Sequence, residues 1–347
     1  MPLHTLALEF LPPGSKVLSI SALGQGNIND TYAVACEGQQ DMVLQRLNHL
    51  IFTEPEAVMH NIDKVCRFLN TQNTEIYTPA PLLTSTGQNL LRDSDGNYWR
   101  AFPMIGNIYT PDAVKDADEA FEIARGYGSF SRALFNFPAT ELRETLPGFH
   151  DTLKRWNAYQ QILQADPVGR RAECIAETEA IAAMLPIFEK IHALKQSGAV
   201  PLRVTHNDTK SGNVLLDKDS GKAVAIIDLD TLMPGVLLSD FGDLVRTAAS
   251  NQYEDDPDTE AMQIRVEILE NLRTGFLEPL QDVLRETERQ YLNTGALWIV
   301  GEQALRFFSD HLAGDRYYKI KYPGHNLVRA RNQIRLFQLL RDHLNGF

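Results

Sequence analysis

The chain has 347 residues, of which 44% are hydrophobic and 22% charged, a composition typical of a globular protein with a sizeable core. A formal net charge of −12 argues against sequence-independent binding of nucleic acid, which needs a basic surface. Only three widely spaced cysteines occur, which argues against a disulfide framework or a zinc site. No run of about 18 apolar residues predicts a membrane span, and no signal peptide is evident, so we expect a soluble cytoplasmic protein.

The first hundred residues are predicted to be rich in β-strands. Short runs of Val, Leu and Ile alternate there with glycine-rich or turn-forming stretches. Residues 55–69 differ, because Val58, Ile62 and Val65 recur at three- and four-residue spacing, which predicts a helix. The expected strands cover residues 16–22, 31–35, 42–47, 82–83, 89–92 and 98–103.

Beyond about residue 105 the pattern becomes mainly helical. One β-rich island, residues 203–230, carries predicted strands at 214–216 and 223–228 on either side of a turn-rich connector. We therefore expect an α+β chain with a small β-rich N-terminal lobe over residues 1–105 and a larger, mainly helical C-terminal lobe over residues 106–347. The expected helices cover residues 113–134, 152–164, 177–195, 260–280, 284–314 and 327–345, the last three with breaks.

The candidate chemistry lies in the β-rich island, where residues 206–213 read HNDTKSGN and residues 226–230 read IIDLD. Phosphoryl transfer needs a carboxylate beside the acceptor hydroxyl and oxygen ligands that hold Mg²⁺ against the phosphates. A tight loop can place Asp208 on the acceptor and Asn213, five residues later, on the metal. A hairpin would return Asp228 beside Asn213. We therefore predict Asp208 as the catalytic base and Asn213 and Asp228 as magnesium ligands.

This order of residues resembles the pattern of the aminoglycoside phosphotransferase and protein-kinase-like superfamily, HxDxxxxN followed by two hydrophobic residues and Asp. The resemblance implies a bilobal protein-kinase-like fold that uses ATP and Mg²⁺. Asp240 lies in Ser-Asp-Phe-Gly, the spelling of a protein-kinase metal motif, but no predicted strand precedes it. We interpret Asp240 as structural, because an acidic residue here hydrogen-bonds the catalytic loop in the resembled fold. Asp230 is either a second metal contact or a brace for the loop.

Residues 23–30, LGQGNIND, lie between the first two predicted strands. Glycine in such a position lets backbone amides approach phosphates, although a hairpin turn has the same appearance. We predict nucleotide contacts from Gly24, Gly26, Asn27 and Asn29.

The third strand of the resembled fold carries a lysine that contacts the phosphates, and no lysine is present in MVLQR, residues 42–46. Gln45 or Arg46 must take that role, and we favour Arg46 because it keeps the positive charge. By the same resemblance, residues 102–105 form the hinge between the lobes. The backbone of Phe102 and Met104 is expected to bind adenine there, with an ordinary edge strand as the alternative.

Longer strings are similar to the N-acetylhexosamine 1-kinase branch of the family. The resemblance implies phosphorylation of the anomeric hydroxyl of GlcNAc or GalNAc, with Arg306 and Tyr317 contacting the sugar beside Asp208. His150 either contacts the substrate or belongs to a structural corner. The matching strings are GNINDTY (26–32), VLQRLN (43–48), PGFHDT (147–152), THNDTKSGNVLLD (205–217), AIIDLDTLMPG (225–235), SDFGDLVR (239–246) and YPGHNLVRARNQ (322–333).

Two alternatives to a sugar 1-kinase stay open. One is a kinase of another small alcohol, such as an amino alcohol or an aminoglycoside; the other is a nucleotide-binding protein without catalysis. Residues 303–335 carry seven Lys or Arg against two acidic residues, which disfavours a polycationic acceptor. We expect a small-molecule sugar as partner, neither nucleic acid nor membrane, and either a monomer or a dimer.

Overall fold

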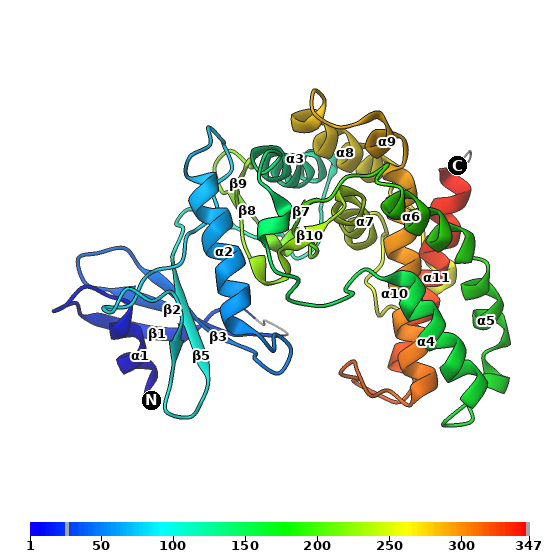
Figure 1. Cartoon of the computed structure of the whole chain (residues 1–347), viewed down its shortest axis with the longest axis horizontal. Coiled ribbons are helices and arrows are strands. Elements are labelled where there is room, and N and C mark those ends of the chain that lie inside the picture. Colours follow the sequence, from blue (N-terminus) through cyan, green and yellow to red (C-terminus); the bar gives the residue numbers. More distant parts are fainter. Residues whose placement is uncertain (25–27, 345–347) are drawn as a thin grey trace.

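The computed structural model describes residues 1–24 and 28–344, and they form two lobes (Figure 1). In the N-terminal lobe, five antiparallel strands form a sheet in the order β1-β2-β3-β5-β4. The elements are α1 (Leu3–Glu9), β1 (Val17–Ala22), β2 (Asp30–Cys36), β3 (Met42–Leu47), α2 (Pro55–Leu69), β4 (Leu91–Arg92) and β5 (Tyr98–Pro103).

The two faces of this sheet have different roles. Side chains alternate between the faces of a strand, and directly paired residues share a face. Leu44 pairs with Ala101, and both are buried in a small core with α1. Gln45 pairs with Arg100 on the opposite face, which is the face turned toward α2 and the C-terminal lobe. Polar side chains of β3 and β5 therefore reach the region where the lobes meet.

Helix α2 belongs to the main core of the molecule, although its sequence lies within the N-terminal lobe. Its buried residues, among them Val58, Ile62 and Val65, form one continuous hydrophobic cluster with the helices of the C-terminal lobe. Figure 1 shows α2 between the sheet and the strands β7 to β10. The small core under α1 is separate from this cluster.

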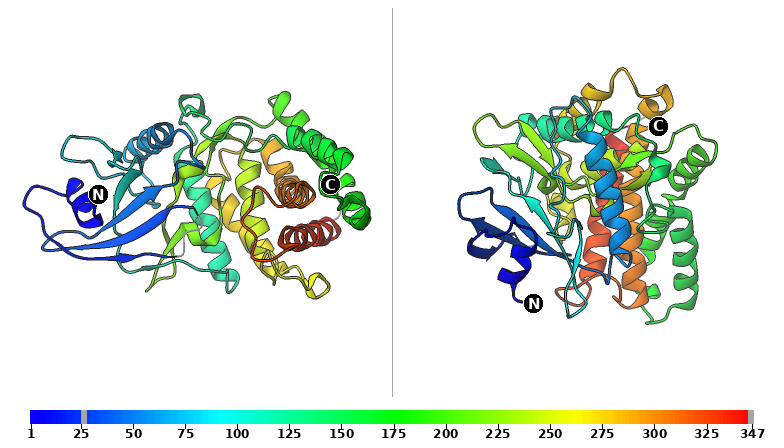
Figure 2. Two further views of the ribbon diagram at one scale, coloured as in Figure 1. Left: turned by 90° about the horizontal axis from the view of Figure 1, so that it is seen from below. Right: turned by 60° about the vertical axis from the view of Figure 1, so that its left-hand side comes forward.

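The C-terminal lobe combines helices with two small sheets, in the orders β6-β8-β9 and β10-β7. Helices α7 and α11 both pack against α10, and helices α4 to α6, drawn in green, lie at the end of the molecule farthest from the five-stranded sheet (Figure 2, left). The elements are β6 (Ile108–Tyr109), α3 (Ala117–Ala133), α4 (Thr152–Ala165), α5 (Ile175–Ala182), α6 (Leu185–Gln196), β7 (Arg203–Thr205), β8 (Val214–Asp217), β9 (Ala223–Ile226), β10 (Met233–Gly235), α7 (Leu237–Ala248), α8 (Val266–Leu277), α9 (Glu286–Gln290), α10 (Leu292–Ala313) and α11 (His325–His343).

Some predicted elements differ from those in the structure. No strand forms at residues 82–83, where the amide of Leu82 only donates to the Ala101 carbonyl (2.8 Å). The helix predicted over 177–195 is divided into α5 and α6, because Pro186 fits the first turn of a new helix but not a helix interior. The predicted lobe boundary at residues 105/106 falls between β5 and β6. Within the described ranges, no helix is long and apolar enough to cross a membrane.

Candidate active site

Two carboxylates of α7 hold the loop that carries Asp208. The Asp240 carboxylate, in the first turn of α7, accepts hydrogen bonds from the backbone amides of His206 (2.9 Å) and Asn207 (2.8 Å). One turn later, Asp243 accepts from the amide of Thr209 (2.9 Å). Burial raises the pKa of Asp240 to about 6, against the opposing effect of these two amides. Asp240 thus braces the catalytic loop, as expected from the sequence. It does so from a helix, α7, whereas a kinase metal ligand would follow a strand.

His206 also braces the loop. Its ring is buried; Nδ1 accepts from the Asp208 amide (3.3 Å), and Nε2 lies 2.9 Å from the Ile227 carbonyl oxygen. These partners assign the ring proton to Nε2. His206 therefore joins the loop to the end of β9, and both of its nitrogens are occupied.

Asp208 is stabilised as a carboxylate. Its Oδ2 accepts from Lys210 Nζ (2.8 Å) and from Asn213 Nδ2 (3.0 Å). Burial acts to raise the pKa of Asp208, but Lys210, His206 and Asn213 outweigh it and hold that pKa below its ordinary value. At neutral pH the side chain is ionised and its orientation is set, which is what a group that positions an acceptor hydroxyl requires.

The two predicted metal ligands meet where β8 and β9 pair. The Asn213 carbonyl accepts from the Ile227 amide (3.0 Å), which places Asp228 directly beside it. Asn213 turns its Nδ2 to Asp208, and this leaves its Oδ1 for a ligand. Asp228 adopts a left-handed backbone conformation, φ 62°.

The electrostatics around Asp228 suit a bound cation. Its side chain is reached by solvent, yet the surrounding protein atoms and the carboxylates of Asp230 and Asp208 raise its pKa to about 7. A divalent cation would relieve this repulsion. No cluster of three or more His, Cys, Asp or Glu suited to a metal occurs in residues 1–24 and 28–344. Mg²⁺ is commonly held by one or two protein groups together with substrate phosphates, so Asn213 and Asp228 fit such an ion.

Asp230 joins the two lobes. It is buried and forms an ion pair with Arg100 of β5 (Nη1 to Oδ1, 2.5 Å). Its other oxygen accepts from Asn29 Nδ2 (2.6 Å). Of the two roles considered for Asp230, these contacts favour a brace over a metal ligand.

The predicted nucleotide loop is described only in part. Gly24 has φ 71°, a conformation that glycine adopts without strain, and lies exposed in open space. Asn29 binds Asp230 through Nδ2 and accepts from the Asn48 amide through Oδ1 (2.9 Å), so its side chain ties the loop to both lobes. Gly26 and Asn27 lie outside the described residues.

Gln45 and Arg46 lie on opposite faces of the sheet. Arg46 pairs in register with Asp30 and Trp99 and forms an ion pair with Asp30, on the face that carries α1. Gln45 lies on the face turned toward the C-terminal lobe and accepts from Arg100 Nε (3.1 Å). The structure therefore does not bring Arg46, the residue favoured from the sequence, to the junction of the lobes, since strand alternation points it away.

The predicted hinge follows β5. Phe102 shares a face with Arg100, whose guanidinium lies 5.2 Å from the centre of the Phe102 ring. The Met104 amide donates to the Asp41 carbonyl (2.8 Å), and the Met104 carbonyl accepts from Gln40 (2.9 Å). Both polar backbone groups of Met104 are thus already bound to the turn between β2 and β3.

Arg306 and Tyr317 come together at a cavity in the C-terminal lobe. With Arg155 and Tyr318 they line a cavity of about 310 Å³ between α4, α10 and the segment that follows α10. The Arg306 guanidinium lies 5.7 Å from the centre of the Tyr318 ring and donates to Gln303 (3.0 Å). Tyr317 is 74% exposed, so its ring is free to meet a ligand.

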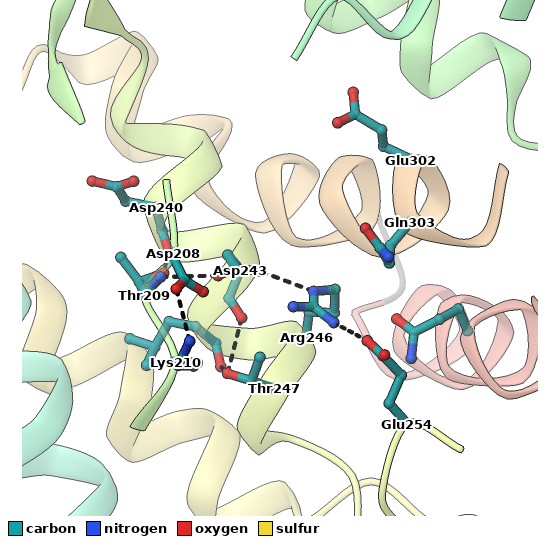
Figure 3. A network of polar contacts seen from close by, with 12 residues as sticks. Asp208, Thr209, Lys210, Asp240, Asp243, Arg246, Thr247, Glu254, Glu302 and Gln303 are labelled. Carbon is teal, nitrogen blue, oxygen red and sulfur yellow. Dashed lines mark hydrogen bonds and ion pairs between the residues drawn. The ribbon is translucent and has the colours of Figure 1, made fainter. Parts of the chain in front are cut away.

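A network of charged groups extends from the catalytic loop along α7 (Figure 3). Arg246 bonds Asp243, which holds Thr209, and reaches Glu254 on its other side (2.5 Å). Burial acts to lower the pKa of Arg306, but the neighbouring Tyr318, Glu302 and Tyr317 outweigh it and raise that pKa.

His150 belongs to a structural corner. Its Nδ1 lies 2.8 Å from Glu302, a buried carboxylate that also binds Thr152, and Trp298 donates to the same threonine (2.6 Å). Burial opposes ionisation of Glu302, but His150, Arg155 and Arg306 outweigh it and lower the pKa of Glu302 to about 2. Of the two interpretations of His150, the structure favours the corner.

Sequence reasoning missed two cations at this site, Lys210 and Arg100. Lys210 lies two residues after Asp208 in the sequence. Only the structure, with 2.8 Å between Lys210 Nζ and Asp208 Oδ2, shows that the two side chains form an ion pair. Arg100 could have been suspected, because an arginine in the middle of a predicted buried strand needs a counter-charge. Its partner, Asp230, is 130 positions away in the sequence, so only the structure identifies it.

Comparison with known proteins gives one family match. The family described as "Phosphotransferase enzyme family" (APH) matches residues 19–272, which include the catalytic loop and the metal-ligand pair but not Arg306 or Tyr317.

Solved structures of similar shape are distant in sequence. The structure of a microcompartment-associated aminopropanol kinase has a TM-score of 0.66 and 17% identity, over 98% of this chain and 95% of that one. The amicoumacin kinase hAmiN, in complex with AMP-PNP, Ca²⁺ and Ami, has a TM-score of 0.63 and 15% identity over 96% and 92%. An aminoglycoside phosphotransferase from Alicyclobacillus acidocaldarius has a TM-score of 0.63 and 14% identity over 95% and 94%. These likenesses confirm the predicted bilobal protein-kinase-like fold.

Proposed function

Since this chain belongs to the phosphotransferase enzyme family, we propose that it transfers the γ-phosphoryl group of ATP to the anomeric hydroxyl of an N-acetylhexosamine, GlcNAc or GalNAc. The observation that carries the kinase assignment is the arrangement of Asp208, Asn213 and Asp228. A carboxylate kept ionised lies beside two oxygen ligands at one end of a hairpin. Phosphoryl transfer depends on such positioning and charge neutralisation rather than on covalent catalysis.

In the proposed mechanism, Asp208 orients the sugar hydroxyl for in-line attack on the γ-phosphate and accepts its proton. Lys210, paired with Asp208, also lies where it can approach the transferred group. Asn213 and Asp228 would hold Mg²⁺, which neutralises phosphate charge when bound. Asp240 and Asp243 fix the loop through its backbone amides, so that Asp208 keeps its place during the transfer.

The acceptor side supports a neutral sugar. Sugar recognition needs fixed hydrogen-bonding groups and an aromatic wall, and Arg306, Gln303 and Tyr317 offer both. The carboxylate that lines the cavity is Asp310, and its two oxygens already accept from the backbone amides of residues 316 to 318 and from Asn326. This leaves Asp310 little capacity for the ammonium groups of an aminoglycoside. A kinase of another small alcohol is the second candidate, since the cavity also suits an uncharged acceptor of other shape.

The test is Mg²⁺-dependent release of ADP from ATP with GlcNAc, GalNAc, ManNAc, glucose, galactose, choline and kanamycin as acceptors. We expect turnover with GlcNAc or GalNAc and a product that has lost its reducing end. Turnover confined to choline or kanamycin would reject the sugar assignment. A reducing product would place the phosphate on another hydroxyl.

The variant Arg306→Met tests the acceptor cavity. It should raise KM for the sugar while KM for ATP stays unchanged, because Arg306 lines the cavity and takes no part in the metal and phosphate site. Arg341→Met is the matched control, because among the described residues this exposed arginine of α11 pairs with its neighbour Asp342. An equal effect of both substitutions would remove Arg306 from the acceptor site.

A further inference from the structure

The third strand lacks the lysine that this fold uses at the phosphates, yet the sheet does present a buried cation on the correct face. On β3, Gln45 occupies the inner face and Arg46 the outer face. Directly opposite Gln45, on the neighbouring strand β5, lies Arg100. Register partners share a face and lie about 5 Å apart, so a side chain from position 100 reaches nearly the same space as one from position 45.

Arg100 is only 1% exposed. Burial of a charged group costs free energy unless hydrogen bonds and a counter-charge compensate for it. Nη1 pairs with Asp230, Nε donates to Gln45, and the guanidinium stacks near the Phe102 ring. A guanidinium has five N–H donors, and among the residues described none accepts from Nη2. A phosphate that enters the junction of the lobes would supply the acceptor that Nη2 lacks among these residues.

The position of Arg100 relative to the metal ligands indicates which ligand this is. Its partner Asp230 lies two residues after Asp228, in the short 3₁₀ turn that follows β9. Arg100 thus lies close to the place where Asn213 and Asp228 would hold a metal ion against phosphates. An arginine matches phosphate oxygens in a bidentate manner.

We propose that Arg100 is the phosphate-contacting residue of this chain: the cation has moved from β3 to β5, and Asp230 and Gln45 hold it in place. The inference deepens the proposed function, since it requires a nucleotide polyphosphate but no particular acceptor. Arg100 would neutralise charge on the phosphates while Asp230, from the other lobe, keeps the guanidinium turned toward them.

A purely structural role is the competing explanation, because the Arg100–Asp230 pair also ties the lobes together. The two roles differ in what they do to nucleotide binding. A phosphate contact favours ATP and ADP over adenosine, whereas a brace affects all three alike. Calorimetric binding of Mg·ATP, Mg·ADP and adenosine therefore separates them.

Four proteins are needed: the wild type, Arg100→Met, Arg46→Met and the double variant Gln45→Lys/Arg100→Met. Arg46→Met is the matched control, an arginine of the same sheet on the opposite face. We expect Arg100→Met to weaken ATP binding roughly 10- to 100-fold, as loss of hydrogen bonds to a charged group implies, and to leave adenosine binding unchanged. Arg46→Met should bind both as the wild type does. The lysine of the double variant should restore most of the ATP affinity, and because it would also reach Asp230, the comparison with adenosine is what separates the two roles.

The outcomes are distinct. Equal weakening of ATP and adenosine by Arg100→Met, or no weakening of either, would overturn the inference. If Arg100→Met fails to fold because Asp230 is left buried without a counter-charge, Arg100→Met/Asp230→Asn removes both charges and should show the same selective loss of ATP binding. A wild-type chain that binds no ATP would overturn the proposed function and this inference with it. ATP binding without turnover of any acceptor would reject only the proposed function.

Discussion

Asp208 shows how one loop can set both the charge and the direction of a side chain. Lys210 and Asn213 bind the same oxygen, Oδ2, and this leaves Oδ1 turned away from the loop's own donors. Because the pKa of Asp208 is held low, the residue acts more as a positioned acceptor than as a strong base. This suits a reaction whose transition state is largely dissociative, where the hydroxyl proton leaves late.

Replacement of Asp208 by Asn tests this role. The amide keeps the shape of the carboxylate but can neither accept the proton nor pair with Lys210, so we expect kcat to fall by about 10²–10⁴-fold. Nucleotide affinity should stay near that of the wild type, because Asn213 and Asp228 are untouched. Steady-state assays and calorimetric titration with Mg·ATP measure the two quantities. Retained turnover by a folded Asp208→Asn protein would exclude Asp208 as the base.

The raised pKa of Asp240 leads to a prediction of how the stability of the protein depends on pH. The pKa of this carboxyl in the folded protein, about 6, lies above the ordinary 3.8, so the folded state binds a proton more readily than the unfolded state does. Stability from this group is therefore fully present below about pH 4 and is lost as the pH rises through 6. Relative to Asp240→Asn, which does not titrate, the wild type should gain on the order of 2–3 kcal/mol between pH 7 and pH 4.

Urea denaturation of both proteins across this pH range measures the difference. Asp118→Asn is the control, since this exposed carboxylate in the first turn of α3 makes no described hydrogen bond. A pH-independent difference between the wild type and Asp240→Asn would show that Asp240 is not protonated in that range. Turnover of Asp240→Asn should also be reduced, because an amide can serve only one of the two backbone amides as acceptor.

The residues of the catalytic loop could be predicted because they are consecutive in the sequence. Asp208 and Asn213 are five positions apart, and in a tight loop this spacing is enough to bring their side chains into contact. Arg100 could not be predicted in the same way, because its place depends on the register of β3 against β5 and on a partner in the other lobe. The choice of Arg46 over Gln45 rested on charge alone and left out strand alternation.

At the scale of elements, α7 explains why residues 239–242, which have the sequence of a protein-kinase metal motif, have a structural role instead. Asp240 binds the catalytic loop, Phe241 packs on Phe276 (5.5 Å between ring centres), and Gly242 allows α10 to come close. A Cβ on Gly242 would lie 2.4 Å from the Gly295 carbonyl oxygen. Each residue of this string thus acts inside a packed helix.

The same helix is absent from those predicted from the sequence, although its apolar residues recur at helical spacing. Ten of its twelve residues are buried, because its polar face lies against the catalytic loop and does not form an exposed polar stripe. α2 has such a stripe, and its predicted bounds, 55–69, are confirmed. The strands β3 and β5 are confirmed with the same bounds, since each combines β-forming residues with turn residues at its ends.

The contact of α7 with α10 makes a stability prediction. A Cβ on Gly295 would lie 2.4 Å from the Leu238 carbonyl oxygen, so Gly295→Ala must push the helices apart and should lower the free energy of unfolding by about 1–3 kcal/mol. Because α7 also holds the catalytic loop, kcat should fall as well. Gly106→Ala, at an exposed position with open space around it, is the control. Denaturation in urea and initial rates test both effects, and a fully stable Gly295→Ala would contradict the close packing.

At the scale of the whole molecule, α2 connects the lobes more firmly than the sequence division suggests. The side chain of Asn61 is 1% exposed and donates to the carbonyls of Arg143 (2.8 Å) and Leu232 (2.9 Å). Its Oδ1 accepts from the Arg143 amide (2.8 Å). Beyond α2, Tyr77 exchanges backbone hydrogen bonds with Val224 and Ile226 at β9. Helix α2 therefore belongs to the same packed body as the C-terminal lobe, and Asp230 joins the sheet of the N-terminal lobe to that body.

Asn61→Leu tests whether this attachment stabilises the molecule as a whole. Leucine has a similar size but leaves two buried carbonyls and one amide without their partner, so we expect a loss of about 2–4 kcal/mol in the free energy of unfolding. Asn157→Leu, an exposed position on α4, is the matched control and should change stability little. If α2 and the C-terminal lobe unfold as one unit, as their shared hydrophobic core implies, the variant will keep a single transition shifted to lower urea. A new early transition of partial amplitude would instead show that α2 and the sheet unfold apart from the C-terminal lobe, and the shared core would not be what holds the lobes together.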